Sequence, residues 1–367
     1  MKAVALVSDA FGGRGGIALY NRNVLNALCR YDGGSQVTAL PRLVSSPPGP
    51  MPAELDYRLE AQGSKLAYCL AAAKLAVRRR DLDLIVASHI HLLPIAEPLR
   101  RLTGAPIVLF VYGVDAWTRR DWLTARLVER IDVLVSIRQH TIERLREWAD
   151  LSHVRCHVLE NAIHLEQYAG RTRRPDLVER YRLEGKRVLM TLARVDEVRF
   201  GFDEILEVLP DLVEEMPDLV YLAVGGGSQL DRLRRKAKQL GVADHVVFTG
   251  AVREEDKADY YYLADAFAMP GSHPTQYDRY PLRFVFLEAM ACGLPVVASR
   301  PEELADDADS PLPNIYVDPD DREDLKRGLR AGLARGAGDV PQQARYYDYP
   351  NFEKRLHTIV DQALRKS

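Results

Sequence analysis

The chain has 367 residues, of which 47% are hydrophobic and 28% charged, and its formal net charge is −2. This is the composition of an ordinary globular protein long enough for two domains, and it gives no case for a nucleic-acid partner. Residues 1–170 carry 21 Lys/Arg against 17 Asp/Glu, a net +4, whereas the remainder carries 29 against 35, a net −6. A mildly basic first half suits an anionic partner or a membrane surface.

The chain contains four scattered cysteines, Cys29, Cys69, Cys156 and Cys292, without a CxxC pair or a histidine cluster. This spacing argues against a disulfide framework and against a structural zinc site. No apolar run approaches the roughly 18 residues that a membrane-spanning helix needs. The N-terminal run MKAVALVSDAFGG is too short for a signal peptide and is typical of a first strand. We therefore expect a cytoplasmic protein, with peripheral contact to the inner face of the membrane as an open alternative.

Short apolar runs alternate with helix-period segments along the first half of the chain. The runs predict strands at Val4–Ser8, Leu84–Ser88, Ile107–Val111, Val133–Ile137 and Val154–Leu159. The segments between them predict helices at Gly16–Arg30, Lys65–Arg80 and Thr141–Asp150. Buried strands that alternate with helices indicate a parallel sheet covered on both faces.

The second half repeats this pattern. Its predicted strands are Val188–Leu192, Val220–Val224, Val246–Phe248, Ala266–Met269 and Val296–Ala298. Its predicted helices are Gly201–Met216, Gln229–Leu240, Arg253–Leu263 and Phe284–Ala291, and the polar segment Gln167–Arg182 is the predicted linker. The predicted fold is α/β, with two doubly wound Rossmann-like domains at residues 1–166 and 167–350 and a last helix within 351–367 that can cross back. Such domains bind ligands at the carboxyl ends of their strands, and two of them facing each other would form a cleft.

The loop at residues 12–16, GGRGG, follows the first predicted strand and opens a helix. Backbone N–H groups at a helix start can receive a phosphate, and glycines permit a close approach. The spacing is not GxGxxG, and no acidic residue about 20 positions further on ends a second strand, which weighs against a dinucleotide site. A flexible turn is the alternative interpretation.

Two groups of polar and aromatic residues follow strands in the first half. Tyr112 and Asp115 could hydrogen-bond a sugar and Trp117 could stack on one; the alternative is a turn capped by Asp115. His89 and His91 form a His-x-His pair, but no third ligand is evident, so we predict no metal site.

In the second half, strand Val188–Leu192 is followed by Arg194 and, five residues later, by Arg199. Two guanidiniums at the carboxyl edge of a sheet can clamp a diphosphate and stabilise negative charge on a departing phosphate. The alternative is ordinary surface charge, because the segment RVDEVR neutralises itself.

Glycine-containing loops close the next two predicted strands. Gly225, Gly226 and Gly227 follow one of them, and the segment FTGAV ending at Val252 closes the other. Glycine lets a backbone come close to a ligand or adopt positive φ. Taken singly, each loop is better explained as a tight strand-to-helix turn.

The segment FVFLEAMACGLPVVAS, residues 284–299, predicts a helix that leads into a strand, with Glu288 as its one acid. A buried carboxylate is costly unless it is paired or functional. From one turn inside the helix it could accept both hydroxyls of a ribose, while the helix start faces phosphate or sugar. A satisfied structural glutamate is the alternative.

Together these segments resemble the GT4 family of retaining glycosyltransferases, which have the GT-B fold, over nearly the whole chain and in the family's order. The matching segments are RGGIALYNRNVLNAL, FVYGVDAW, LVSIRQHTIERLREW with VLENAIHLEQY, LARVDEVRFGFDEIL and LEAMACGLPVVAS. They look like the family's glycine loop, HG-x-(D/E)-x-W segment, interdomain helix and turn, GR-x-x-x-x-K-G donor loop and E-A-M-A-x-G-x-P-V-V segment.

The resemblance implies a metal-independent transfer that needs no cofactor and retains configuration, from a nucleotide-sugar donor to a glycan or lipid-linked acceptor. The second domain would bind the donor and the first the acceptor. The implied catalytic residues are Arg194, Arg199, Glu288 and Tyr112. The candidate donor-binding residues are Gly15, Gly16, Gly225, Gly226, Val252, Leu282, Arg283, Phe284 and Val285, and the candidate acceptor-binding residues are Asp115, Trp117 and His89.

The sequence departs from the family pattern in three places. Tyr280 replaces the first of two acids, and PLR at 281–283 replaces Gly-Phe-Gly; Tyr112 replaces a histidine; and Arg199 replaces a lysine, with Phe200 as the alternative alignment. These changes leave two rival functions open. One is a catalytically silent nucleotide- or glycan-binding partner protein, and the other is a sugar-nucleotide epimerase or phosphorylase on the same scaffold.

Contact with an anionic membrane is a separate hypothesis. The amphipathic segment Lys65–Arg80 ends in three arginines, and Trp117, Arg119, Arg120 and Trp122 form a second basic-aromatic cluster. Such a surface can rest on anionic lipid. The alternative is a core-facing helix with a solvated basic end.

Overall fold

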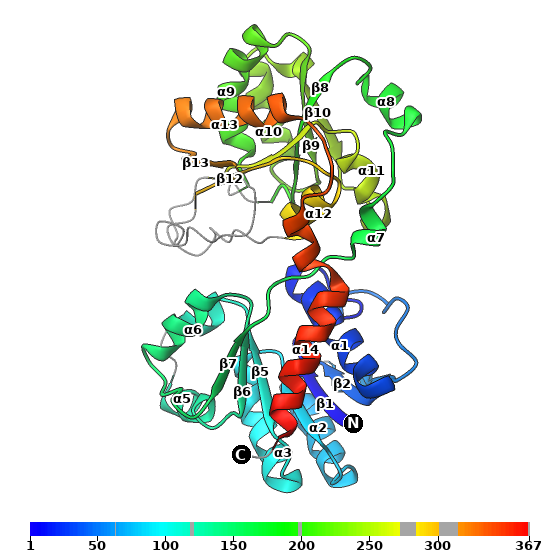
Figure 1. Ribbon diagram of the computed structural model, residues 1–367, viewed down its shortest axis with the longest axis vertical. Coiled ribbons are helices and arrows are strands. Elements are labelled where there is room, and N and C mark those ends of the chain that lie inside the picture. Colours follow the sequence, from blue (N-terminus) through cyan, green and yellow to red (C-terminus); the bar gives the residue numbers. More distant parts are fainter. Residues whose placement is uncertain (63, 118–120, 197–199, 272–283, 301–314, 366–367) are drawn as a thin grey trace. The chain divides into compact units, whose positions relative to one another are not determined.

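The computed structural model of the protein describes all residues except 63, 118–120, 197–199, 272–283, 301–314 and 366–367 (Figure 1). The chain divides into two compact units. The first comprises Met1–Ala162 together with Tyr349–Ser367, and the second comprises Ile163–Asp348. The C-terminal segment thus groups with the first unit.

A seven-stranded sheet in the order β3-β2-β1-β4-β5-β6-β7 forms the centre of the first unit, and its neighbouring strands pair in parallel. The strands are β1 (Lys2–Val7), β2 (Gln36–Pro41), β3 (Leu55–Tyr57), β4 (Leu84–Ala87), β5 (Ile107–Val111), β6 (Val133–Ser136) and β7 (Arg155–Val158). β4, β5 and β6 are buried at every position, as expected for a parallel sheet covered on both faces.

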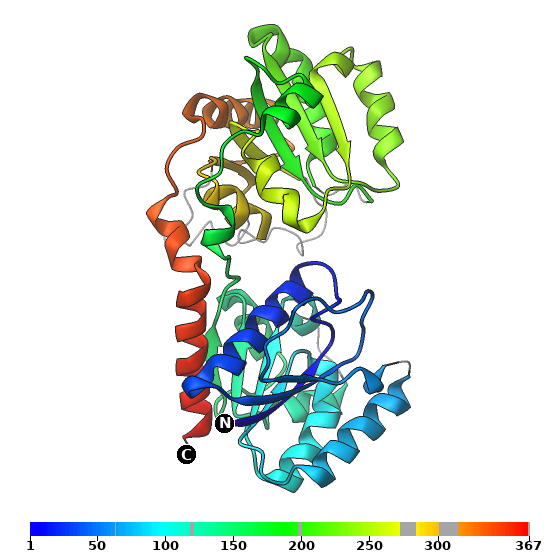
Figure 2. The same cartoon turned by 90° about the vertical axis from the view of Figure 1, so that its right-hand side faces the viewer.

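The helices of the first unit are α1 (Gly16–Arg30), α2 (Lys65–Arg78), α3 (Leu93–Thr103), α4 (Val114–Trp117), α5 (Trp122–Val128), α6 (Gln139–Arg146) and α14 (Tyr349–Leu364), with 3₁₀ turns η1 (Tyr31–Gly33), η2 (Leu59–Ala61) and η3 (Ile90–Leu92). Helix α14 runs beside α1, where Nε2 of His357 lies 2.8 Å from the carbonyl oxygen of Ala27 (Figure 2). None of the helices in the described ranges is long and apolar enough to cross a membrane.

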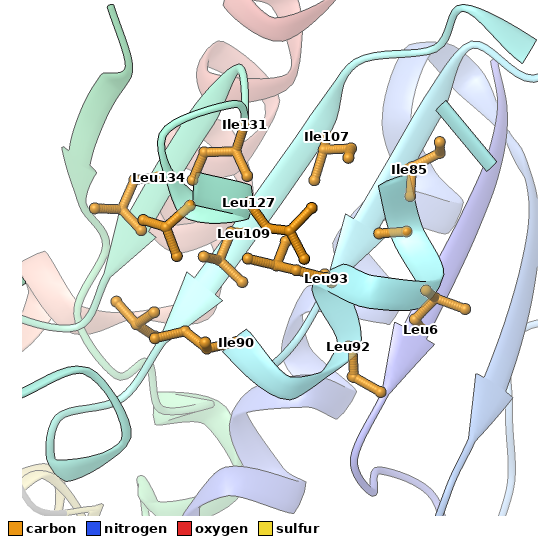
Figure 3. Close-up of a cluster of buried hydrophobic side chains, with 14 of the residues drawn as sticks. Leu6, Ile85, Ile90, Leu92, Leu93, Ile107, Leu109, Leu127, Ile131 and Leu134 are labelled. Carbon is orange, nitrogen blue, oxygen red and sulfur yellow. The ribbon is translucent and has the colours of Figure 1, made fainter. Parts of the chain in front are cut away.

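Apolar side chains from strands and helices converge on one face of this sheet (Figure 3). Leu109 of β5 and Leu134 of β6 meet Leu93 of α3 and Leu127 of α5, and all four are buried. Removing this apolar surface from water stabilises the unit by roughly 25 cal/mol per Å². The packing fixes the positions of the strand ends that carry the candidate site.

The second unit has a six-stranded sheet in the order β10-β9-β8-β11-β12-β13, again paired in parallel. Its strands are β8 (Arg187–Leu192), β9 (Leu219–Val224), β10 (Val246–Gly250), β11 (Ala266–Met269), β12 (Val296–Ser299) and β13 (Ile315–Val317). Its helices are α7 (Leu165–Tyr168), α8 (Pro175–Tyr181), α9 (Phe202–Glu215), α10 (Leu230–Gln239), α11 (Lys257–Tyr261), α12 (Phe284–Ala291) and α13 (Arg322–Arg335), with turns η4 (Ala243–His245), η5 (Glu254–Asp256) and η7 (Gln342–Tyr347).

The interpretation of Gln167–Arg182 as a linker is wrong. This segment contains α8, whose Leu177 is only 7% exposed and packs in the core of the second unit. Arg171 and Arg174 each bond Asp259 of α11, at 2.7 and 3.0 Å. The polar residues that suggested a linker are therefore the outward side of a packed element.

Leu177→Ala tests this packing. Truncating a buried leucine removes apolar contacts and leaves a cavity, so we expect the free energy of unfolding to fall by about 2 kcal/mol or more. Glu179→Ala, on the exposed side of the same helix, should change it by less than about 0.5 kcal/mol. Chemical denaturation of both variants checks this, and equal stabilities would restore the linker interpretation.

Candidate functional site

The strand order of the second unit reverses between β8 and β11, and open α/β sheets bind ligands at such a point. The loops that follow these two strands meet there. Gly201, with φ at 87°, lies against Pro270, and a Cβ atom at Gly201 would stand 2.8 Å from the backbone nitrogen of Pro270. Only glycine permits this approach, which brings the loop carrying Arg194 next to the loop that leads to α12.

The glycines after β9 allow a second close approach. A Cβ atom at Gly225 would lie 1.8 Å from the carbonyl oxygen of Ala193, and one at Gly226 would lie 3.0 Å from Ala251. The N–H of Val195 donates to the carbonyl of Gly226 at 2.9 Å. Neighbouring backbone alone therefore explains Gly225, which supports the tight-turn alternative there and leaves donor binding by Gly225 and Gly226 a prediction.

These contacts fix the backbone on both sides of Arg194, whose side chain is exposed at the carboxyl edge of the sheet. Val252, after β10, is half-buried against the core. Phe284 and Val285 open α12 and are also half-buried. These four candidates follow strands at the carboxyl edge of the sheet, and their roles in donor binding remain predictions.

Four of the residues named for the donor site lie outside the described residues. These are Arg199, Tyr280, Leu282 and Arg283. Their predicted roles remain predictions.

Glu288 is 2% exposed and lies at the centre of a polar cluster beneath this edge. Tyr261 donates a hydrogen bond to its Oε2 at 2.7 Å, and Nζ of Lys257 lies 3.6 Å from its Oε1. Tyr168 of α7 also lies near and lowers the pKa of the Glu288 carboxyl. The single acid of α12 is therefore paired, as a buried carboxylate must be.

The charges in this cluster shift one another's protonation. Burial raises the pKa of the Glu288 carboxyl above its ordinary value, against the opposing effects of the Lys257 ammonium and the Tyr261 hydroxyl. Burial lowers the pKa of Lys257, but the carboxylates of Glu288 and Glu254 outweigh it, so the net shift is upward. Perturbed groups of this kind gather at functional sites as well as in structural ion pairs.

In the first unit the strand order reverses between β1 and β4. The N–H of Ser8, after β1, donates to Oγ of Ser88, after β4, at 2.9 Å. Gly15, with φ at 88°, and Gly16 are exposed at the start of α1, and His89 is half-buried after β4. These candidates lie at the edge where the topology predicts a ligand site.

Tyr112 follows β5 and donates a hydrogen bond to Oδ1 of Asn21 in α1 at 2.6 Å. The amide of Asn21 in turn donates to the carbonyl of Asp9 at 2.8 Å. The ring of Tyr112 also packs edge-on against Tyr20, with ring centres 5.5 Å apart. Tyr112 therefore ties β5 to the helix whose start carries the glycine loop.

The structure corrects the expectation that Trp117 stacks on a sugar. The side chain is 5% exposed and belongs to the core of the first unit. Its Nε1 donates to Oγ1 of Thr141 at 3.2 Å, and the guanidinium of Arg138 lies 4.6 Å from the ring centre. Core packing and this cation–π contact occupy the ring instead. Asp115 lies in α4 beside it.

Lys257 and Tyr261 are site residues that the sequence reasoning missed. They stand four positions apart on α11, a spacing that puts both side chains on the same side of a helix. The sequence signal that could have revealed them is a lysine four positions before a tyrosine, within a run of three consecutive tyrosines at 260–262.

His89 and His91 contact each other. Their rings stack with centres 4.8 Å apart, and the N–H of His91 donates to Nδ1 of His89 at 3.1 Å. Over the described part of the chain, no group of three or more His, Cys, Asp or Glu side chains is arranged to hold a metal ion.

Comparison with known proteins finds a family match over most of the second unit. Residues 186–334, which include Arg194 and Glu288, match the family model of glycosyl transferases group 1. HepE of Anabaena in complex with UDP has the same fold, with a TM-score of 0.71 at 16% identity over 98% of this chain and 100% of that one. Sucrose-phosphate synthase of Thermosynechococcus elongatus also has a TM-score of 0.71, at 18% identity over 99% of both chains. The predicted GT-B fold is confirmed, and the resemblance to group 1 glycosyltransferases is confirmed over residues 186–334.

Among curated relatives, the chain is 43% identical over 123 residues to the GDP-mannose-dependent alpha-(1-6)-phosphatidylinositol monomannoside mannosyltransferase of Mycolicibacterium smegmatis, a match that covers 33% of this chain and 32% of that protein. It is 32% identical over 155 residues to mannosylfructose-phosphate synthase of Agrobacterium fabrum, a match that covers 40% of this chain and 32% of that protein. These matches span about a third of the relatives' length.

Glu288→Gln tests whether the buried acid serves stability. Because its folded pKa is raised, the contribution of Glu288 to stability is fully present at low pH and is lost as the pH rises through that pKa. We expect the variant to gain free energy of unfolding relative to the wild type as the pH rises above the ordinary glutamate pKa, measured by urea denaturation.

Asp203→Asn is the matched control with the opposite sign. Asp203 is also partly buried, but Arg232 and Lys236 hold the pKa of its carboxyl below the ordinary value despite that burial. The stabilising effect of Asp203 is present above the ordinary pKa of an aspartate. The loss of free energy of unfolding in Asp203→Asn, relative to the wild type, should therefore grow as the pH rises. If the free energy of unfolding of Glu288→Gln also fell further below that of the wild type as the pH rises, Glu288 would be a structural residue.

Proposed function

We propose that the protein is a glycosyltransferase that moves a sugar from a nucleotide-sugar donor to a hydroxyl of a glycan or lipid-linked acceptor, with retention of configuration and without a metal ion. The match of residues 186–334 to the group 1 family carries this proposal, because that segment contains the β8 edge, the glycine turns and Glu288. The transfer itself remains to be measured.

In this proposal the second unit holds the donor. Arg194 is exposed at the edge where a diphosphate would lie, and a guanidinium there neutralises the charge that develops on the departing phosphate. Arg199 and Arg283 are proposed to share that role. Glu288 accepts the ribose hydroxyls, and backbone near Val252 lies against the base.

The chemistry we propose is a front-face transfer, in which the leaving phosphate accepts the proton of the attacking hydroxyl. Tyr112 is a poor base near neutral pH because a phenol has a pKa of about 10. Its hydroxyl donates to Asn21, so we assign it the task of orienting the start of α1. The acceptor would lie beside this residue and His89.

The donor we propose to test first is GDP-mannose. The relative with 43% identity over 123 residues is described as GDP-mannose-dependent, whereas the solved neighbour from Anabaena contains UDP. A thermal-shift screen with GDP, UDP, ADP, TDP and their sugars separates these donors. Transfer to a lipid-linked acceptor, with the anomer of the product assigned by NMR and EDTA added in parallel, then tests retention and metal independence.

Arg194→Ala is expected to lower turnover by about 100-fold or more, because a cation facing the leaving phosphate acts mainly in the transition state. The matched control is Arg335→Ala, an exposed arginine at the end of α13. It should retain wild-type kinetics. Wild-type turnover and donor affinity in both Arg194→Ala and Glu288→Ala would refute the assignment of the donor site.

We also propose that α2 rests on anionic membrane. Its residues Leu66, Leu70 and Val77 are 69%, 61% and 69% exposed, and their spacing puts them on one side of the helix. Lys65 and Lys74 flank this apolar stripe on the helix surface and are also exposed. Apolar side chains flanked by lysines suit the boundary between headgroups and acyl chains.

The second basic-aromatic cluster does not form as predicted, because Trp117 is buried. Trp122, at the start of α5, is 75% exposed. Arg119 and Arg120 lie outside the described residues. Helix α2 therefore carries the membrane proposal.

Sedimentation with vesicles containing anionic lipid tests the α2 surface. The wild type should sediment at low salt and, less strongly, at physiological salt, because screening weakens the lysine contribution. The double variant Leu66→Gln/Leu70→Gln should lose most binding at both, whereas Met51→Gln, an exposed apolar residue elsewhere in the first unit, should not. A wild type that stays in the supernatant at both salt concentrations would contradict the proposal.

A further inference from the structure

Lys257 occupies an unusual position for a lysine near the protein surface. Its side chain is 19% exposed, and its ammonium lies 2.8 Å from Oε1 of Glu254 and 3.6 Å from Oε1 of Glu288. Lysine side chains normally bury the stem and keep the charged end in water. Here Glu254 is exposed and could be met by an outward-directed ammonium, yet the ammonium also lies next to the buried acid.

The direction of this side chain follows from the helix that carries it. Lys257 and Tyr261 stand four residues apart on α11, which packs against α12. Both side chains therefore approach Glu288 from the same side, one at each carboxylate oxygen. Tyr261 fixes the orientation of the carboxylate by its hydrogen bond to Oε2, and Lys257 supplies the compensating charge at Oε1.

This arrangement leaves capacity for a ligand. A carboxylate offers about four acceptor sites, and the hydroxyls of Tyr261 and Tyr168 use at most two of them. At 3.6 Å the Lys257 ammonium is a neighbouring charge rather than a hydrogen-bond donor. Oε1 thus keeps lone pairs for the hydroxyls of a ribose, next to a positive charge that favours the carboxylate as an anion.

We propose that Lys257 is a positioning residue for donor binding, which holds Glu288 as an anion and, with Tyr261, in the orientation that receives the ribose of a nucleoside diphosphate. This inference rests on the proposed function. A hydrogen bond to a charged acceptor is stronger than one to a neutral acid. Loss of Lys257 therefore weakens the contact at the ribose hydroxyls and leaves the base and phosphate contacts in place.

The titratable groups around Glu288 come from several elements. Lys257 and Tyr261 lie on α11, Glu254 on η5, Tyr168 on α7 and Cys292 just after α12. The turn η7, also packed on α12, carries Arg345 and Tyr347. Lys257 is the cation whose attraction lowers the pKa of Glu288 against the effect of burial, so its removal moves protonation of Glu288 to higher pH.

The test measures the preference for ribose over deoxyribose. Isothermal titration calorimetry compares GDP with 2′-deoxy-GDP, and UDP with 2′-deoxy-UDP, from pH 6 to pH 9. We expect the wild type to favour the ribonucleotide about tenfold at pH 7, a typical value for a hydrogen bond to a charged group. In Lys257→Met this preference should fall to near one at pH 7 and return in part at pH 9, whereas Lys257→Arg should keep it.

Lys236→Met is the matched control. Lys236 is similarly covered and also pairs with two acids, Asp203 and Glu207, but it lies on α10. Its loss should lower stability without changing the ribose preference. If Lys257→Met does not fold, Glu254→Gln serves instead. This variant removes the second acid beside Lys257, so that Glu288 is the remaining carboxylate of the pair, and the ribose preference should then persist to a lower pH than in the wild type.

An unchanged ribose preference in Lys257→Met at every pH would overturn this inference and leave Lys257 a structural residue. A shift of the Glu254→Gln profile to higher pH would also overturn it. A wild type that binds none of GDP, UDP, ADP and TDP would overturn the proposed function and this inference with it, so the two failures are distinct.

Discussion

Burial of both faces of two parallel sheets is the constraint on which the rest of this structure depends. Strands such as β5 (Ile107–Val111) are buried at every position, so they carry almost no polar chemistry. The polar and charged groups of the candidate sites therefore lie in the loops at the carboxyl ends of the strands and on the helices. In each unit these loops meet where the strand order reverses, and at Gly201 and Gly225 the absence of a side chain lets backbone segments touch.

Glu288 is a charged side chain buried inside the most apolar helix of the site. Its burial has a free-energy cost that Tyr261 and Lys257 only partly offset, which is why the pKa of its carboxyl remains raised. Natural proteins accept such costs where a group has a task to perform. The same carboxylate thus links the stability of the second unit to its proposed contact with the donor.

Several elements could be predicted closely because their patterns are local. Helix α1 (Gly16–Arg30) and helix α12 (Phe284–Ala291) have the predicted bounds, as do strands β5 and β11. Strands β2, β3 and β13 were not predicted, because β3 and β13 have three residues each and β2 ends in proline. The segment of α8 was misinterpreted because its arginines pair with Asp259, far along the chain.

The sequence by itself determined the fold class, the two-unit plan and the strand ends at which a ligand would bind, since alternating apolar runs and glycine turns are local signals. Tertiary structure decided the surroundings of individual side chains. It buried Trp117 beneath Arg138, exposed one apolar side of α2 while burying the other, and brought Lys257 to Glu288. These outcomes depend on which helix packs against which, and such contacts join residues whose distance along the chain carries no local pattern.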